Sequence, residues 1–165
     1  FCFSIFSSIS QTNEDVPLNN IAINEIPKPI SSLIFEDFSG NEINLKHYHG
    51  RLVIINFWAT WCAPCKKEMP SLDNLYQDNN FKNLQIFAVN MEQPNALKTK
   101  KFFTDLNIQK LEIFFDPNLN FVKEFKLRGM PTTILINKKG EEFARIIGET
   151  NFRDKKFLKW LSKYD

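Results

Sequence analysis

The chain has 165 residues, 43% of them hydrophobic, which is enough for one domain with a sizeable core. Its 21 basic and 19 acidic residues are intermixed and leave a net charge of +2, so the sequence predicts no basic surface for nucleic acid. The lysines between residues 155 and 163 are interpreted as the solvent face of a terminal helix and not as a site for an anionic partner.

The first ten residues, FCFSIFSSIS, are typical of the end of an apolar leader or membrane anchor, although this stretch is too short by itself to span a bilayer. A secretory leader would place the folded part in an oxidising compartment, where disulfide chemistry matters. A cytosolic chain with an arbitrary start is the alternative. We assign Cys2 to the leader and give it no catalytic role, with lipid attachment at Cys2 as another alternative.

Residues 7–32 indicate a linker or an extended arm. They are rich in Ser, Asn and Ile, contain three prolines, and show no steady hydrophobic period. We therefore divide the chain into a leader remnant and linker arm over 1–32 and a folded domain over 33–165.

From Leu33 onward the hydrophobic pattern becomes regular. In chain order it predicts two short strands within 33–45, a strand over 51–58, a helix over 64–77, a strand over 84–90, a helix that begins at Pro94, a strand over 111–116, a short helix over 118–125, a hairpin over 132–147 and a last helix over 152–164. This order predicts an α/β fold, with a central mixed β-sheet flanked by helices on both faces and a short N-terminal β-hairpin extension.

Each predicted helix has an apolar stripe that should face the core. The residues expected to point inward are Met69, Leu72, Leu75 and Tyr76; Leu97, Phe102, Phe103 and Leu106; Leu119, Val122 and Phe125; and Phe157, Leu158 and Leu161.

The segment FWATWCAPCKKEMP, residues 57–70, contains a C-x-x-C pair formed by Cys62 and Cys65. A structural zinc site generally needs four ligands, and the chain offers one close pair. His47 and His49 could complete a zinc or copper site in principle, but we interpret them as surface residues on a short turn. A purely structural disulfide is not favoured either, because so short a loop restricts the unfolded chain very little.

A redox centre explains the surroundings of the pair better. Cys62 and Cys65 lie where a buried strand ends and a helix begins, and Pro64 suits the first helical turn. The free N–H groups and positive end of the helix stabilise a thiolate at Cys62, and thiol pKa values fall from about 8.5 in such places. Lys66 and Lys67 add a weak positive charge nearby. Cys65 should be the shielded, resolving sulfur, and this chemistry requires no metal or organic cofactor.

WCAPCKKEMP preceded by NFWAT, together with GMPTTILI at residues 129–136, resembles the thioredoxin superfamily. More narrowly, the chain resembles the TlpA/ResA branch of bacterial membrane-tethered, periplasmic thiol–disulfide oxidoreductases. The resemblance covers residues 33–164. It implies a thioredoxin-like fold with a redox-active Cys62/Cys65 dithiol separated by Ala63 and Pro64.

One departure from cytoplasmic thioredoxins is informative. Those proteins have an acid on the strand six residues before the first cysteine, where this chain has Asn56, which cannot take a proton from Cys65. Glu68 matches the acid of the TlpA/ResA pattern, and a carboxyl half-buried beside a thiol would have a raised pKa suited to proton exchange. The alternative is a first-turn glutamate that interacts with the helix dipole or with a lysine.

The resemblance also implies a substrate-docking edge. The superfamily holds the proline at position 131 in cis beside the cysteines, so the N–H and C=O of Met130 could pair with an extended peptide. An ordinary trans Pro131 at the start of a strand is the alternative. Trp61 would shield the thiols and offer substrates a flat contact, whereas Trp58 is expected in the core.

Ala63 and Pro64 lack the extra histidine found in strong oxidants, which favours a reductant. The resemblance implies reduction of apocytochrome c or of copper-site assembly proteins of cytochrome oxidase, on the periplasmic side of a bacterial inner membrane, with a membrane thiol donor restoring the dithiol. The alternatives are a periplasmic disulfide oxidase or isomerase and a copper-binding chaperone that uses Cys62, Cys65 and a histidine. A peroxidase is disfavoured because such enzymes usually place their attacking cysteine in a different local sequence.

Overall fold

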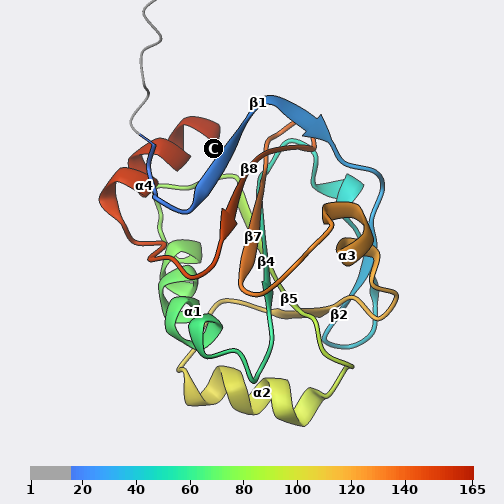
Figure 1. The fold of residues 1–165 in the computed structure, drawn as a ribbon. Helices are drawn as coiled ribbons and strands as arrows, with labels where there is room; N and C mark the ends of the chain where they lie inside the picture. Colours follow the sequence, from blue (N-terminus) through green and yellow to red (C-terminus); the bar gives the residue numbers. More distant parts are fainter. Residues whose placement is uncertain (1–15) are drawn as a thin grey trace, which may run out of the picture.

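The computed structural model describes residues 16–165, so the proposed leader and Cys2 lie outside the described residues. Eight strands form a single sheet, and helices cover it on both sides (Figure 1). The elements are β1 (Ile21–Pro29), β2 (Ile34–Asp37), β3 (Glu42–Asn44), η1 (Leu45–Tyr48), β4 (Leu52–Trp58), α1 (Ala63–Tyr76), β5 (Leu84–Asn90), α2 (Ala96–Asp105), β6 (Ile113–Phe115), α3 (Asn120–Phe125), β7 (Thr132–Ile136), β8 (Glu141–Ile147), α4 (Lys155–Leu161) and η2 (Ser162–Tyr164).

The sheet is mixed, as the sequence predicts. Its strand order is β1-β8-β7-β4-β5-β6-β2-β3. β4 pairs in parallel with β5 and β5 with β6, while the neighbours on either side pair antiparallel. The predicted N-terminal hairpin is the β2–β3 pair, which continues the sheet beyond β6.

Strand β1 lies within the segment that the sequence assigns to the linker arm. It pairs antiparallel with β8, from Ile21 opposite Ile146 to Pro29 opposite Glu141, with an irregularity between Ile23 and Lys28. β1 is an edge strand, where proline is tolerated and one side needs no apolar residues, so it lacks the alternation that reveals a buried strand. The arm thus contributes a strand to the sheet; the division at residue 33 stays a prediction.

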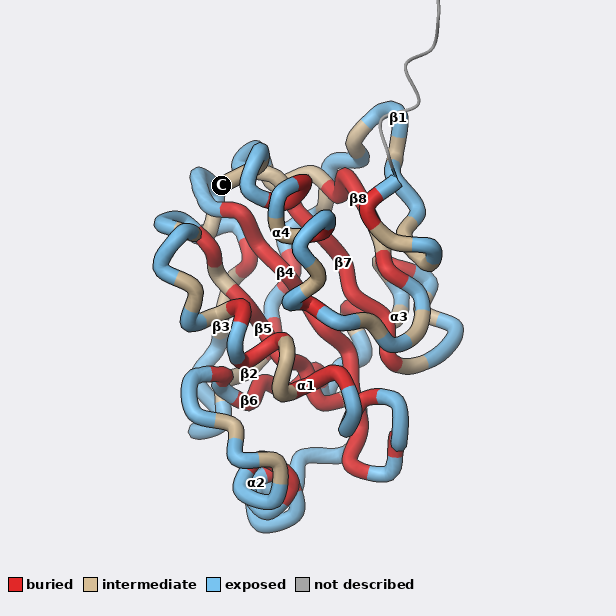
Figure 2. The backbone as a smooth tube through the Cα atoms, turned by 90° about the vertical axis from the view of Figure 1, so that its left-hand side faces the viewer, coloured by how far each residue is buried: buried red, intermediate tan, exposed pale blue. Residues whose placement is uncertain are grey.

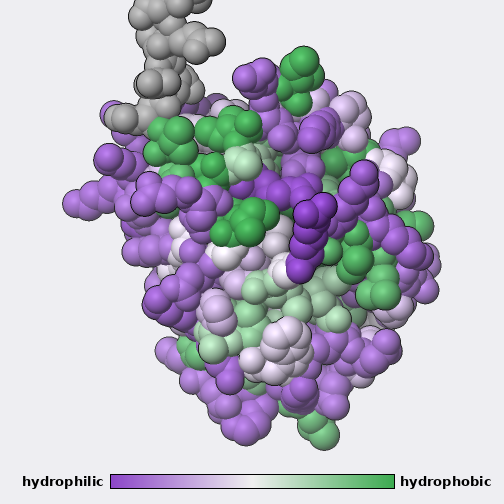
Figure 3. Space-filling view, viewed as in Figure 1, coloured by the Kyte–Doolittle hydropathy of each residue, from purple (hydrophilic) through white to green (hydrophobic). Residues whose placement is uncertain are grey.

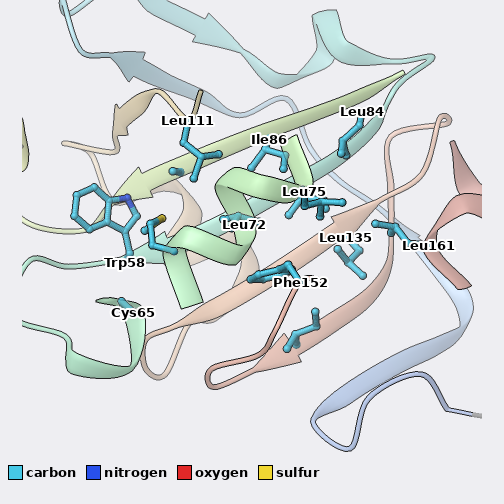
Figure 4. Packing of buried hydrophobic residues seen from close by; sticks show 14 of the residues in the cluster. Trp58, Cys65, Leu72, Leu75, Leu84, Ile86, Leu111, Leu135, Phe152 and Leu161 are labelled. Atoms are coloured by element: carbon cyan, nitrogen blue, oxygen red, sulfur yellow. The ribbon is translucent and has the colours of Figure 1, made fainter. Parts of the chain in front are cut away.

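Strand β4 supplies both halves of the core. All seven of its residues are buried, and its alternate side chains enter two hydrophobic clusters on opposite faces of the sheet. One cluster includes side chains of α1, α2 and α4, and the other includes side chains of α3 and η1. Figure 2 shows the buried central strands in red, and Figure 4 shows Leu75 of α1 close to Leu84 and Ile86 of β5. The expected core position of Trp58 is confirmed.

Eight of the fourteen predicted inward-facing residues are buried and four are half-buried, but two are exposed. Leu97 is 85% exposed, because it lies two residues, about 200°, away from the buried Thr99 on α2. Leu119 is 47% exposed, because it precedes α3 in a left-handed conformation and the helix instead buries Phe121 and Phe125. The prediction for Leu119 extended a helical period beyond the start of α3, whereas Leu97 lies within α2 but on its solvent face.

Candidate active site

The C-x-x-C pair lies at the junction between β4 and α1. Cys62 is the N-cap of α1, and its Sγ accepts a hydrogen bond from the Cys65 N–H at 3.3 Å. The two cysteines form a disulfide, with their Cα atoms 5.3 Å apart. A thiolate at Cys62 would be stabilised by the same N–H and by the positive end of the helix. Pro64 occupies the first turn of α1, as predicted.

The two cysteine residues differ in exposure in the expected direction, but both are buried, so Cys62 is less exposed than expected. Cys62 is 4% exposed and Cys65 is fully buried. Ala63 and Pro64, between them, are exposed on the first turn of α1. Cys62 is therefore the cysteine that an incoming disulfide can reach.

Glu68 lies behind the disulfide, about one helical turn after Cys65, and is only 2% exposed. Asn56 Nδ2 donates to Glu68 Oε1 at 2.7 Å, and the Thr150 N–H donates to Oε2 at 3.0 Å. Burial raises the pKa of Glu68 to about 7, although these hydrogen bonds act in the opposite direction and Glu149 reinforces the rise. The carboxyl can therefore hold or release a proton near neutral pH.

The alternative interpretation of Glu68, a first-turn glutamate that interacts with the helix dipole or with a lysine, does not fit its position. It lies beyond the first turn of α1, and among residues 16–165 the neighbouring Lys67 forms its ion pair with Glu149 instead. Asn56 is fully buried, donates a second hydrogen bond to Thr133 Oγ1 at 3.0 Å, and has an Oδ1 with no partner in the described structure.

The loop before β7 closes another side of the site. The Met130–Pro131 peptide bond is cis, as the resemblance implies. Thr132 pairs with Phe57, so the sheet register places Pro131 beside the carboxyl end of β4, from which the chain leads to Cys62. Met130 is half-buried and packs against the cluster that contains both cysteines.

Trp61 directly precedes Cys62 and is 67% exposed, so it is available for contact with a partner. It borders a hollow of about 290 Å³ between the active-site loop and α2, together with Lys66 and Lys98 among others.

Glu92 is the site residue that sequence reasoning missed. It accepts hydrogen bonds from the Thr60 N–H at 2.6 Å and the Thr60 hydroxyl at 3.0 Å, and it pairs with Lys98 Nζ at 2.6 Å. Burial opposes ionisation, but the hydrogen bonds from Lys98, Thr60 and Asn90 outweigh it and lower the pKa of Glu92 to about 2. Glu92 therefore ties the loop that carries Trp61 and Cys62 to the segment after β5. A polar residue just beyond a buried strand was the available signal.

The structure brings Trp61, Cys62, Cys65, Glu68 and the Met130–Pro131 loop to one end of β4. His47 and His49 lie at the other end of this seven-residue strand, about 20 Å away. They therefore do not join the cysteines in a metal site. Within residues 16–165 no group of three or more His, Cys, Asp or Glu residues is placed to share a metal ion.

No helix in the described range, 16–165, combines the length and apolar character needed to cross a membrane.

Comparison with known proteins agrees with this geometry. The AhpC/TSA family matches residues 26–141. The thiol-disulfide oxidoreductase ResA of Halalkalibacterium halodurans is 37% identical over 110 residues, covering 67% of this chain and 61% of that protein. The ResA of Bacillus cereus strain ZK / E33L is 32% identical over 125 residues, covering 76% of this chain and 71% of that protein. The chain thus spans about three fifths to seven tenths of the length of these relatives.

Solved structures share the fold. A secreted thiol-disulfide isomerase from Corynebacterium glutamicum superposes with a TM-score of 0.73 at 19% identity, over 87% of this chain and 92% of that one. StoA from Bacillus subtilis gives a TM-score of 0.65 at 24% identity, over 84% of this chain and 98% of that one. At these identities the likeness shows a thioredoxin-like architecture and no more.

Proposed function

Because the chain belongs to the AhpC/TSA family and, within it, to the ResA-type thiol-disulfide oxidoreductases, we propose that it reduces disulfide bonds of partner proteins through Cys62 and Cys65. The observation that carries the proposal is the buried Glu68 carboxyl, one helical turn behind a disulfide that caps α1. This arrangement supplies both an accessible sulfur and a proton acceptor for the shielded one.

In the reduced protein, the Cys62 thiolate attacks one sulfur of the partner disulfide. That S–S bond breaks, a mixed disulfide forms between Cys62 and the partner, and the second partner sulfur leaves as a thiolate that takes up a proton. Cys65 then gives its proton to Glu68, directly or through water, and attacks Cys62 Sγ. The bond between Cys62 and the partner breaks, the partner sulfur leaves as a thiolate that takes up a proton from solvent, and the partner is then a dithiol. The chain keeps the Cys62–Cys65 disulfide, so two electrons have passed to the partner.

Docking in this proposal uses the edge beside the disulfide. An extended partner segment pairs with the N–H and C=O of Met130, next to the cis Pro131, and rests against the exposed ring of Trp61. The position of this loop at the end of β4 supports the assignment.

The direction and partners form the finer part of the proposal. We place the chain on the periplasmic side of a bacterial inner membrane, where it reduces apocytochrome c or copper-site assembly proteins. A membrane thiol donor then reduces its Cys62–Cys65 disulfide again. Similarity to proteins named ResA and the Ala63-Pro64 dipeptide support a reductant.

The test is the reduction potential of the Cys62/Cys65 pair, measured by equilibration with dithiothreitol, together with insulin reduction. We expect a potential nearer to that of thioredoxin, about −270 mV, than to that of strong oxidants, about −120 mV. A value near the strong oxidants, with no insulin reduction, would replace the reductant with a disulfide oxidase or isomerase.

The partners are identified by trapping. Cys65→Ser should accumulate a mixed disulfide between Cys62 and its substrate, because the resolving sulfur is gone. Cys62→Ser is the matched control and should trap nothing. Adducts that contain neither an apocytochrome c nor a copper-site assembly protein would refute the proposed substrates while leaving the chemistry intact.

A further inference from the structure

A groove opens directly beside the proposed docking loop. Its volume is about 840 Å³, and it runs between β1, β8 and the segment from the end of α3 to the start of β7. Met130 and Pro131 are among its lining residues. The view in Figure 3 is that of Figure 1, in which β1, β8 and α3 face the viewer, and it shows a pale, weakly apolar area bordered by purple hydrophilic side chains.

The lining of this groove is basic. Four of its side chains are cationic and two are acidic: Lys28, Lys126, Arg128 and Arg145, against Glu124 and Glu142. The whole chain, by contrast, has nearly balanced charges. A local excess of positive charge therefore lies next to the proposed substrate edge.

The two acids are already engaged. Arg145 donates two hydrogen bonds to the Glu142 carboxylate, at 2.8 and 3.1 Å. It donates a third to the Phe125 carbonyl at 2.8 Å. The hydroxyl of Ser31 donates to Glu124 at 2.6 Å. The Glu142–Arg145 pair is neutral and holds the end of α3 in place through the Phe125 carbonyl, whereas Glu124 keeps its charge; the four cations and two acids leave the groove net positive.

The remaining cations have no such partner. Lys28, Lys126 and Arg128 are exposed, and none of them forms an ion pair with any residue between 16 and 165. Arg128 is two residues from Met130, and Lys126 is four residues from it. We call Lys28, Lys126 and Arg128 the basic rim.

Given the proposed function, on which this inference rests, we infer that the groove binds an acidic segment of the partner protein adjacent to its reactive cysteine. A chain held at Met130 continues into the groove, and an extended segment advances about 3.3 Å per residue, so carboxylates within a few residues of the cysteine meet the basic rim. Charge complementarity of this kind speeds encounter and selects partners more than it adds raw affinity.

The test uses three disulfide peptides with the same two-cysteine core and with acidic, neutral or basic flanks on both sides. For the unmodified chain we expect kcat/KM for the acidic peptide to exceed that for the neutral one by about three- to tenfold at low ionic strength, and the basic peptide to be the poorest substrate. The preference should fade near 1 M salt, where the screening length falls to about 3 Å.

Charge reversal locates the preference. Lys126→Glu/Arg128→Glu should abolish or invert the ratio of acidic to neutral peptide, and the milder Lys126→Gln/Arg128→Gln should reduce it even if the reversal impairs folding. Lys138→Glu/Lys139→Glu makes the same charge change on an exposed turn at the other end of β7 and should keep the ratio. If instead Lys66→Glu, beside Trp61, removes the preference and both rim variants retain it, the groove is not the site.

Binding separates this inference from the proposed function. The same peptides with serine in place of cysteine are followed by fluorescence anisotropy, which needs no chemistry. If the acidic serine peptide binds more tightly but none of the cysteine peptides is reduced, the proposed reductase activity is rejected and the groove is retained. Equal binding of all three peptides at low salt would overturn the groove, whatever the rate of reduction.

Discussion

Glu68 and Glu92 lie on two sides of the same active-site loop, and their surroundings shift their pKa values in opposite directions. Behind the disulfide, burial raises the pKa of Glu68 to about 7. After β5, where Glu92 contacts Thr60, a lysine and several hydrogen-bond donors outweigh burial and lower the pKa of Glu92 to about 2. One carboxyl is suited to exchange a proton at neutral pH, whereas the other is a permanent charge that holds the loop. The difference arises from both burial, which is deeper at Glu68, and hydrogen-bond donors, which are more numerous at Glu92.

The largest expected effect is on stability as a function of pH. Between pH 4.5 and about 7 the folded chain keeps a proton on Glu68 that the unfolded chain has released, so the free energy of unfolding falls as pH rises. The loss is of the order of 3 kcal/mol and is complete above about pH 7. Urea unfolding at pH 4.5, 6 and 8 measures it, and Glu68→Gln should be the more stable protein at pH 8. If the free energy of unfolding of both proteins changes equally with pH, the effect belongs to another group.

The next effect is on turnover. Glu68→Gln should lower kcat for disulfide reduction by about ten- to a hundredfold, because the amide cannot accept the proton of Cys65. The rate of the unmodified protein should change around pH 7 with the ionisation of Glu68, and this inflection should vanish in the variant. Single-turnover kinetics from pH 5 to 9 provide the measurement. An unchanged profile would remove Glu68 from the mechanism.

Glu92→Gln should destabilise the fold by about 1–2 kcal/mol, because it weakens the bonds to Thr60 and Lys98 in a partly solvated site. Its contribution is present above pH 4.5 and is lost as pH falls toward about 2, which is opposite in sign to that of Glu68. Denaturant unfolding at pH 7 and pH 3 should show a smaller difference between the two proteins at pH 3. Lys101→Gln, which breaks an exposed pair with Asp105, is the control and should have little effect.

The smallest effect concerns the neighbour of Glu68. Glu149→Gln removes a negative charge that raises the pKa of Glu68 and releases Lys67 from its ion pair. Both changes should move the inflection of the pH–rate profile slightly downward. A shift to higher pH would show that Glu149 acts through the backbone of Thr150 and not through its charge.

Much of this site was predictable because its residues are close in sequence. Cys62 caps α1, and Cys65 and Glu68 lie in its first two turns, so the helical spacing together with the resemblance predicted that the three are neighbours; their roles stay predictions. Glu92 acts through Thr60, 32 residues earlier in the chain. Such a contact depends on how the ends of β4 and β5 lie together. The sequence indicates only that a polar residue follows a buried strand, and not which loop it binds.

The fold shows the same division. The buried strands have nearly continuous apolar runs and α1 has a helical period, so they were predicted closely. β1 was not, because its order comes from pairing with β8 and not from its own residues. The cis Pro131 was expected only from the resemblance, since the residues around it contain no other signal.

The unpartnered Oδ1 of Asn56 has a consequence for the resting state. A buried carbonyl oxygen that lacks a donor is costly, and turning the amide would let the O–H of a protonated Glu68 supply one. In that orientation the hydrogen bond to Oδ1 exists only while the Glu68 carboxyl is neutral. In the oxidised protein Glu68 would therefore hold a proton, which it returns to Cys65 when the disulfide is reduced.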